Sequence, residues 1–92
     1  MQRSKDKNTL KRGLLLKALA KTMKELRGKK SQFMFSSEND ISISIISMAE
    51  RGMKDPQMTT LFKLAEAYGM DITEFVSLIR EKLPKDFFLI EK

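Results

Sequence analysis

Cysteine and histidine are both absent from this chain of 92 residues. Without cysteine, the protein has no disulfide framework and no thiolate that could bind a metal or act as a nucleophile. Without histidine, it lacks the commonest general base and the commonest zinc ligand. Carboxylates remain, but each is better explained as a helix cap or a surface charge. We therefore expect neither an enzyme nor a bound metal or other cofactor.

Long apolar runs are missing as well. Near the N-terminus the longest run is Leu14-Leu15-Leu16. A membrane-spanning helix needs about 20 apolar residues, and a signal peptide also needs a longer apolar segment than this one. The sequence thus predicts a cytoplasmic protein without a membrane partner. A chain of this length can bury one modest core, which predicts a single domain.

Positive charge is abundant and unevenly distributed. Residues 1–30 carry 11 Lys and Arg against 2 Asp and Glu, a net charge of +9, whereas residues 31–92 carry 7 against 10, a net charge of −3. Such a chain presents one positive end to a polyanion such as nucleic acid, although a solubilising tail would have the same composition. Residues 1–8 have no apolar period, which predicts a flexible basic arm with three cations: Arg3, Lys5 and Lys7.

The residues after the arm predict a long helix and then two short ones. The first helix is expected to begin at Asn8 or Thr9 and to run to about Arg27. Its apolar residues lie three or four positions apart on one stripe: Leu15, Leu19, Met23 and Leu26. Ser31 and Ser42 can each cap a short helix. Between these two helices, Asn39-Asp40 can form a tight turn, since both side chains tolerate a left-handed backbone.

Two further helices are expected before the chain ends in a short tail. Asp55 can cap a fourth helix that begins at Pro56, where the missing N–H costs nothing. Asp71 and Glu74 have the spacing of a capping box, which predicts a fifth helix that runs to about Leu83. The tail, residues 84–92, contains Phe87-Phe88-Leu89-Ile90. Because four consecutive apolar residues rarely stand free in water, the tail could cover its own domain or contact a neighbouring chain.

Three segments, in this order and at these separations, resemble the helix-turn-helix of the lambda-repressor/Cro (XRE) family: Ser31-Gln32, Ile41-Ser42 through Glu50-Arg51-Gly52, and Leu61 through Val76. The resemblance implies an all-α, five-helix lambda-repressor-like DNA-binding domain over residues 9–83. It implies a transcriptional regulator, acting as a repressor on double-stranded DNA. It also implies a homodimer, with the fifth helix and Phe87–Ile90 as the candidate interface, and an ion pair between Arg27 and Glu50.

The resemblance also implies which residues meet DNA. In this family the third helix enters the major groove and its outward residues contact base edges. The matching positions here are Ile43, Ser44, Ser47 and Met48. The phosphate-binding positions are Gln32, Lys29, Lys30, Arg51 and Lys54. The basic arm would add contacts to the backbone or the minor groove.

The base-contacting positions depart from the family pattern. Members usually place Gln, Arg, Lys or Asn there, because these side chains form bidentate bonds with purines. Isoleucine and methionine can only pack on thymine methyl groups or exclude water. Three interpretations stay open: weak base recognition supported by phosphate charge and DNA shape, an apolar face turned to a protein partner, or a face shielded by the arm or the tail. The protein-partner interpretation is an interaction module, most concretely an antitoxin.

Overall fold

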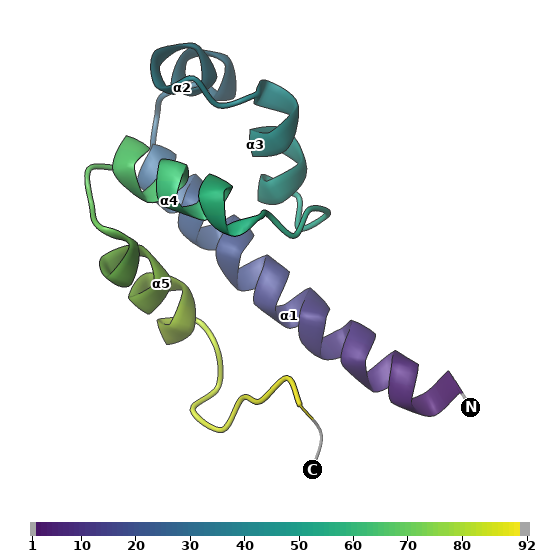
Figure 1. Ribbon diagram of the computed structural model, residues 1–92. Coiled ribbons are helices and arrows are strands. Elements are labelled where there is room, and N and C mark those ends of the chain that lie inside the picture. The colour runs from purple at the N-terminus through teal and green to yellow at the C-terminus, as the bar shows by residue number, and fades with distance from the viewer. Residues whose placement is uncertain (1, 91–92) are drawn as a thin grey trace.

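Five helices follow one another in this computed structural model, which describes the backbone of residues 2–90 and the side chains of residues 9–90 (Figure 1). They are α1 (Gln2–Arg27), α2 (Gln32–Asn39), α3 (Ile43–Glu50), α4 (Met58–Ala67) and α5 (Ile72–Glu81). No strand occurs within residues 2–90. The predicted all-α, five-helix class is therefore confirmed. Within the same residues, no helix is long and apolar enough to cross a membrane.

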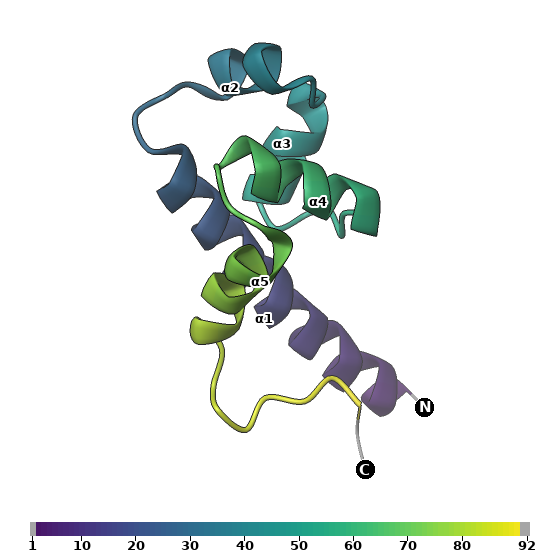
Figure 2. The ribbon, with the colours of Figure 1, turned by 60° about the vertical axis from the view of Figure 1, so that its left-hand side comes forward.

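The core forms along the C-terminal half of α1, where the other helices gather (Figures 1 and 2). α1 packs against α3 and α5, α2 packs against α3, and α4 packs against α5. The predicted stripe of α1 faces this core, since Leu19 and Met23 are buried and Leu15 and Leu26 pack partly buried against them. Burial of such side chains contributes about 1.5–3 kcal/mol each to folding. The apolar period of α1 thus decides where the core lies.

A stack of three aromatic rings joins α2 to the later helices. The ring of Tyr68 lies 5.0 Å from that of Phe35, in a stacked arrangement, and 5.5 Å from that of Phe75. Such aromatic pairs add about 0.5–1.5 kcal/mol beyond their buried area. The stack therefore fixes α2 over the turn between α4 and α5.

The first helix begins earlier than the sequence predicts. α1 begins at Gln2, so the expected start at Asn8 or Thr9 is wrong, and the backbone of residues 2–8 forms the first turns of α1 in place of an arm. Residues 2–8 contain no Pro or Gly, and Gln, Arg and Lys extend an existing helix at little cost. The side chains of the three arm cations (Arg3, Lys5 and Lys7) lie outside the described side chains, so their contact with DNA stays a prediction.

The fourth helix begins later than predicted. α4 begins at Met58 with Gln57 at the N-cap position, so the expected cap at Asp55 and first turn at Pro56 are wrong. Instead, Pro56 is buried, and the Asp55 carboxylate lies 3.6 Å from Nε of Arg12 in α1. Residues 53–57 form no helix, since Pro56 is buried and Gln57 has an extended backbone, and α4 starts after them.

Candidate nucleic-acid interface

The joint between α2 and α3 is a tight turn held by local hydrogen bonds. Asp40 has φ 53°, the left-handed backbone that its short polar side chain tolerates. The hydroxyl of Ser36 donates to the carbonyl of Ile41 over 2.6 Å, and the amide of Asn39 donates to the carbonyl of Phe35 over 2.9 Å. The Ser36 bond ties α2 to the segment before α3, and the Asn39 bond closes the last turn of α2. The predicted turn is thus confirmed.

The two serine caps behave differently. The hydroxyl of Ser31 accepts from the backbone N–H of Met34 over 3.1 Å, as predicted. Ser42 occupies the N-cap position of α3, but its side chain makes no capping bond. Its hydroxyl lies 3.1 Å from the hydroxyl of Ser44 instead. The predicted position of Ser42 as N-cap is confirmed, but the predicted capping hydrogen bond is wrong, because the hydroxyl of Ser44 competes for the Ser42 side chain.

The predicted pair of Arg27 and Glu50 is present and bidentate. Nε of Arg27 donates to Oε2 of Glu50 over 2.8 Å, and Nη2 donates to Oε1 over 2.7 Å. The Glu50 side chain is only 2% exposed. A planar guanidinium suits such a site, since its two parallel bonds satisfy both carboxylate oxygens. This pair fixes the end of α3 to the end of α1.

Hydrogen bonding sets the ionisation of this pair. Burial alone would raise the pKa of Glu50, but hydrogen bonds from Arg27 and Gln32, together with the charge of Arg27, hold that pKa below its ordinary value. The hydrogen bond to Glu50 in turn raises the pKa of Arg27. Both groups are therefore charged near neutral pH, as a stable ion pair requires.

Gln32, predicted to bind a phosphate, is part of the same network. Its side-chain Nε2 donates to Oε1 of Glu50 over 2.9 Å. A side-chain amide nitrogen carries two donor hydrogens, so one remains for another acceptor. This bond could not be predicted from the sequence, because the two residues lie 18 positions apart on different helices. The start of α2 is thus held to the end of α3.

The base-contacting candidates all lie on α3 outside the core. Ile43 is 44% exposed, Ser44 is exposed, and Ser47 and Met48 are half-buried. The neighbouring Ile45 packs partly buried against the core instead. In both views, residues 84–90 and the N-terminal turns of α1 lie at the opposite end of the molecule from α3 (Figures 1 and 2). Shielding of α3 by the described part of the tail, or by the backbone of the expected arm, is therefore excluded in this structure.

Positive side chains gather around the C-terminal end of α3, where Arg27 and Gln32 hold the connection between α1 and α2 to Glu50. Lys29 and Lys30 lie in the connection from α1 to α2, and Arg51 and Lys54 follow α3 directly; all four are exposed. Lys30 pairs with the carboxylate of Glu38, a contact that the sequence did not reveal because eight residues separate the two. Within the described side chains, Lys29, Arg51 and Lys54 form no ion pair with a carboxylate. These cations can attract a polyanion toward α3.

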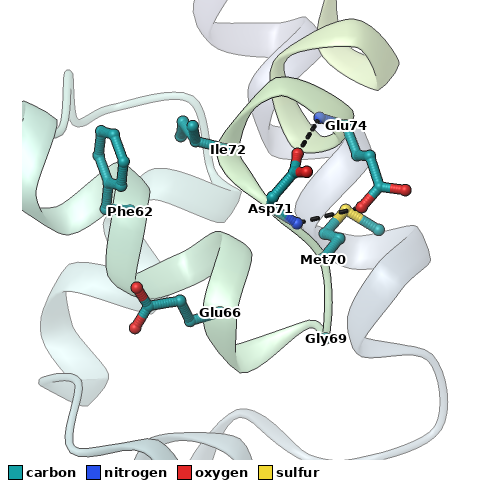
Figure 3. Close-up of a pocket in the computed structure, with 7 residues that line it drawn as sticks. All are labelled: Phe62, Glu66, Gly69, Met70, Asp71, Ile72 and Glu74. Atoms are coloured by element: carbon teal, nitrogen blue, oxygen red, sulfur yellow. Dashed lines mark hydrogen bonds between the residues drawn. The ribbon is translucent and has the colours of Figure 1, made fainter.

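Acidic side chains gather elsewhere. Figure 3 shows an open pocket at the turn between α4 and α5, lined by Glu66, Asp71 and Glu74 together with Phe62 and Ile72. The backbone N–H of Glu74 donates to the Asp71 carboxylate over 3.0 Å, and the N–H of Asp71 donates to Glu74 over 3.1 Å, which confirms the predicted capping box. Hydrogen bonds from Thr73 and the backbone lower the pKa of Asp71. This turn is therefore negatively charged, in contrast to the cationic surface at the end of α3.

The acidic side chains do not form a metal site. Within the described residues, no group of three or more acidic side chains could hold a metal ion. Asp71 and Glu74 instead accept the backbone N–H groups at the start of α5. The arrangement at this turn is explained by helix capping alone.

Comparison with known proteins agrees with this geometry. A family model described as helix-turn-helix matches residues 23–75, which is more than half of the 92 residues. The match runs from the end of α1, through the α2–turn–α3 unit, into α5. No curated protein and no solved structure matches the chain significantly. The match, the order of the helices and the Arg27–Glu50 pair all agree. The chain therefore belongs to the lambda-repressor/Cro (XRE) family of helix-turn-helix DNA-binding regulators.

Proposed function

We propose that the protein is a transcriptional repressor that recognises a specific sequence of double-stranded DNA by docking α3 in the major groove. The observation that carries the proposal is the exposed face of α3, which bears no free carboxylate and ends beside the exposed cations Lys29, Arg51 and Lys54. The only acidic residue of α3, Glu50, is buried and paired with Arg27. Repression follows from occupancy, because a bound domain excludes polymerase from the same DNA.

The α3 side chains supply the base contacts in this proposal. Residues near the start of a recognition helix reach deepest into the major groove. Ile43 and Ser44 occupy the first turn, and Ser47 and Met48 follow one turn later. The network of Arg27, Glu50 and Gln32 supports this role by holding α2 and α3 as one rigid unit.

Phosphate contacts supply most of the affinity. Lys29, Arg51 and Lys54 lie beside α3, and Gln32 brings one amide hydrogen together with the free N–H groups at the start of α2. Lys30 reaches a phosphate by leaving Glu38, which costs little because exposed ion pairs contribute about 0–1 kcal/mol. Binding is therefore expected to weaken steeply with salt, by a slope of about 0.9 per phosphate neutralised.

Selection from a random duplex library tests the proposal. The expected result is enrichment of one consensus with two-fold symmetry. Binding that depends on charge but enriches no sequence would contradict specific recognition, and no binding at all would contradict the DNA-binding role. Lys54→Ala is a useful companion variant, because it should weaken binding to every duplex alike and reduce the salt slope by about 0.9.

We also propose a homodimer. A domain with one short recognition helix contacts few base pairs, and a two-fold dimer doubles that number. The exposed apolar side chains on α5 and in the tail support this interface, since Val76, Phe88 and Ile90 are 46%, 68% and 73% exposed. Dimerisation would remove these side chains from water.

The alternative function is a protein-interaction module, such as an antitoxin that neutralises a partner protein. The same exposed tail favours it, because an apolar segment of this kind can also dock on a second protein. Expression together with the neighbouring genes, followed by purification through a tag on this chain, separates the two functions. A second polypeptide recovered in equal amount would favour the alternative, whereas recovery of this chain alone would favour the repressor.

A further inference from the structure

We infer that α3 recognises thymine methyl groups, so that the preferred DNA site is defined by thymines rather than by guanines. This inference rests on the proposed docking of α3 in the major groove. It names the chemical group that the helix recognises there, and the residue that recognises it.

Bidentate recognition of purines is not available to the outward side chains of α3. Arg or Lys bonds to two acceptors of guanine, and Asn or Gln bonds to a donor and an acceptor of adenine. Ile43 has no polar atom, and Met48 has only a weakly accepting sulfur. Ser44 and Ser47 each have a single hydroxyl, and that of Ser44 already lies 3.1 Å from the hydroxyl of Ser42.

Ile43 has the position that a methyl contact requires. It is the first residue of α3. The N-terminal end of a recognition helix enters the groove most deeply. The Ile43 side chain is 44% exposed, so part of its apolar surface has no partner in the free domain. Along the major-groove edges of the bases, the one apolar group is the C5-methyl of thymine. Contact between the Ile43 side chain and this methyl group removes apolar surface of both the protein and the DNA from water.

Charge favours DNA over an apolar protein surface as the occupant of this face. Lys29, Arg51 and Lys54 flank α3 without an ion pair among the described side chains. An apolar protein partner that covered Ile43 would bring these cations toward its own surface without neutralising them. A duplex places its phosphates along both walls of the groove, and its methyl groups lie on the floor between them. The combination of an apolar start and a cationic end of α3 therefore matches a major groove with thymine methyl groups on its floor and phosphates along its walls.

Replacement of thymine by deoxyuridine tests the inference directly, because it removes the methyl group and leaves base pairing intact. The duplex enriched by selection serves as the probe, with each thymine replaced in turn and affinity measured at fixed salt. At the contacted position, the wild-type protein should lose about fourfold in affinity. Ile43→Ala should bind the thymine duplex about as weakly as the wild type binds the uracil duplex, and it should no longer distinguish the two. Ile43→Val should retain part of the discrimination.

Lys54→Ala is the matched control, since it should weaken binding to both duplexes by the same factor. Equal affinity of the wild type for thymine and uracil at every position would overturn the inference while leaving specific DNA binding in place. A discrimination that survives in Ile43→Ala would overturn the assignment of the methyl contact to Ile43, because another residue would then contact the methyl. If selection enriches no duplex, the proposed function fails first, and the inference fails with it.

Discussion

At the scale of single residues, Glu50 connects three helices. It accepts hydrogen bonds from Arg27 at the end of α1 and from Gln32 at the start of α2, while it closes α3. A buried carboxylate is stable only when its oxygens are satisfied in this way. The same side chain therefore supports both the fold and the placement of the recognition helix.

Glu50→Ala should lower the free energy of unfolding by about 3 kcal/mol, because it leaves the partly buried guanidinium of Arg27 without its partner. Thermal or urea denaturation measures the change. Glu38→Ala is the matched control, since the exposed pair of Glu38 and Lys30 should contribute less than about 1 kcal/mol. A melting temperature of Glu50→Ala that equals that of the wild type would refute a structural role for the pair.

The lowered pKa of Glu50 makes stability depend on pH. Because the folded-state pKa lies below the ordinary value of 4.5, the unfolded chain binds this proton more readily than the folded one. The stabilisation is fully present above pH 4.5 and is lost as the pH falls through the folded-state pKa. Melting temperatures recorded from pH 6 to pH 2 should fall more steeply for the wild type than for Glu50→Gln, and parallel curves would contradict this assignment.

Removal of the Tyr68 hydroxyl, unlike removal of the Glu50 carboxylate, should not destabilise the fold. It is buried and has no hydrogen-bond partner among the described residues, and burial raises its pKa well above the ordinary value of 10.0. Tyr68→Phe should therefore leave the free energy of unfolding unchanged or raise it by up to about 1 kcal/mol, because it removes an unsatisfied group and keeps the ring stack. The melting temperature measures this change. Tyr68→Leu, which loses the stack, should be destabilised. A clear loss of stability in Tyr68→Phe would show that the hydroxyl has a partner.

At the scale of helices, the sequence predicts the apolar faces and the C-terminal ends better than the first residues. The apolar stripe of α1 lies where its period predicts, and Gly28, Gly52 and Gly69 have positive φ after α1, α3 and α4. The start of α4 differs, because burial of Pro56 and the contact of Asp55 with α1 act across the chain rather than along it. Local signals thus specify that a helix exists, while tertiary contacts shift its first residue.

The two serines before α2 and α3 provide a matched test of capping. Ser31→Ala should cost about 1 kcal/mol of stability, because it removes the acceptor of the Met34 N–H. Ser42→Ala should cost much less, since the hydroxyl of Ser42 bonds with that of Ser44 and caps nothing. Equal losses in denaturation experiments would mean that Ser42 caps α3 in solution.

At the scale of the whole molecule, the apolar tail lies far from the cations at α3. Cations gather at the end of α3, acidic side chains surround the turn between α4 and α5 (Figure 3), and the tail, with its exposed Phe88, Leu89 and Ile90, lies at the far end from α3 (Figures 1 and 2). This arrangement leaves one face for DNA and another for a second copy of the chain. The two proposed contacts can therefore form at the same time.

The dimer proposal predicts the effect of changing the tail. Phe88→Ser combined with Ile90→Ser should convert a dimer into a monomer in light scattering, because it removes the apolar contact, and should leave the helical circular dichroism unchanged. Phe33→Ser is the matched control, since Phe33 on α2 is 67% exposed and Phe88 is 68% exposed. A wild-type protein that stays monomeric from micromolar to millimolar concentration would eliminate the homodimer.

The sequence by itself determined the five helices, the turn at Asp40 and the pairing of Arg27 with Glu50, the last through its resemblance to a family. Period, capping and turn signals act within a few residues, so they can be recognised along the chain. Only the tertiary structure decided that Gln32 bonds to Glu50, that Pro56 is buried, and that Ile45 packs on the core. Each of these depends on how helices distant in sequence meet, because burial and hydrogen bonding between elements are set by packing rather than by the order of residues.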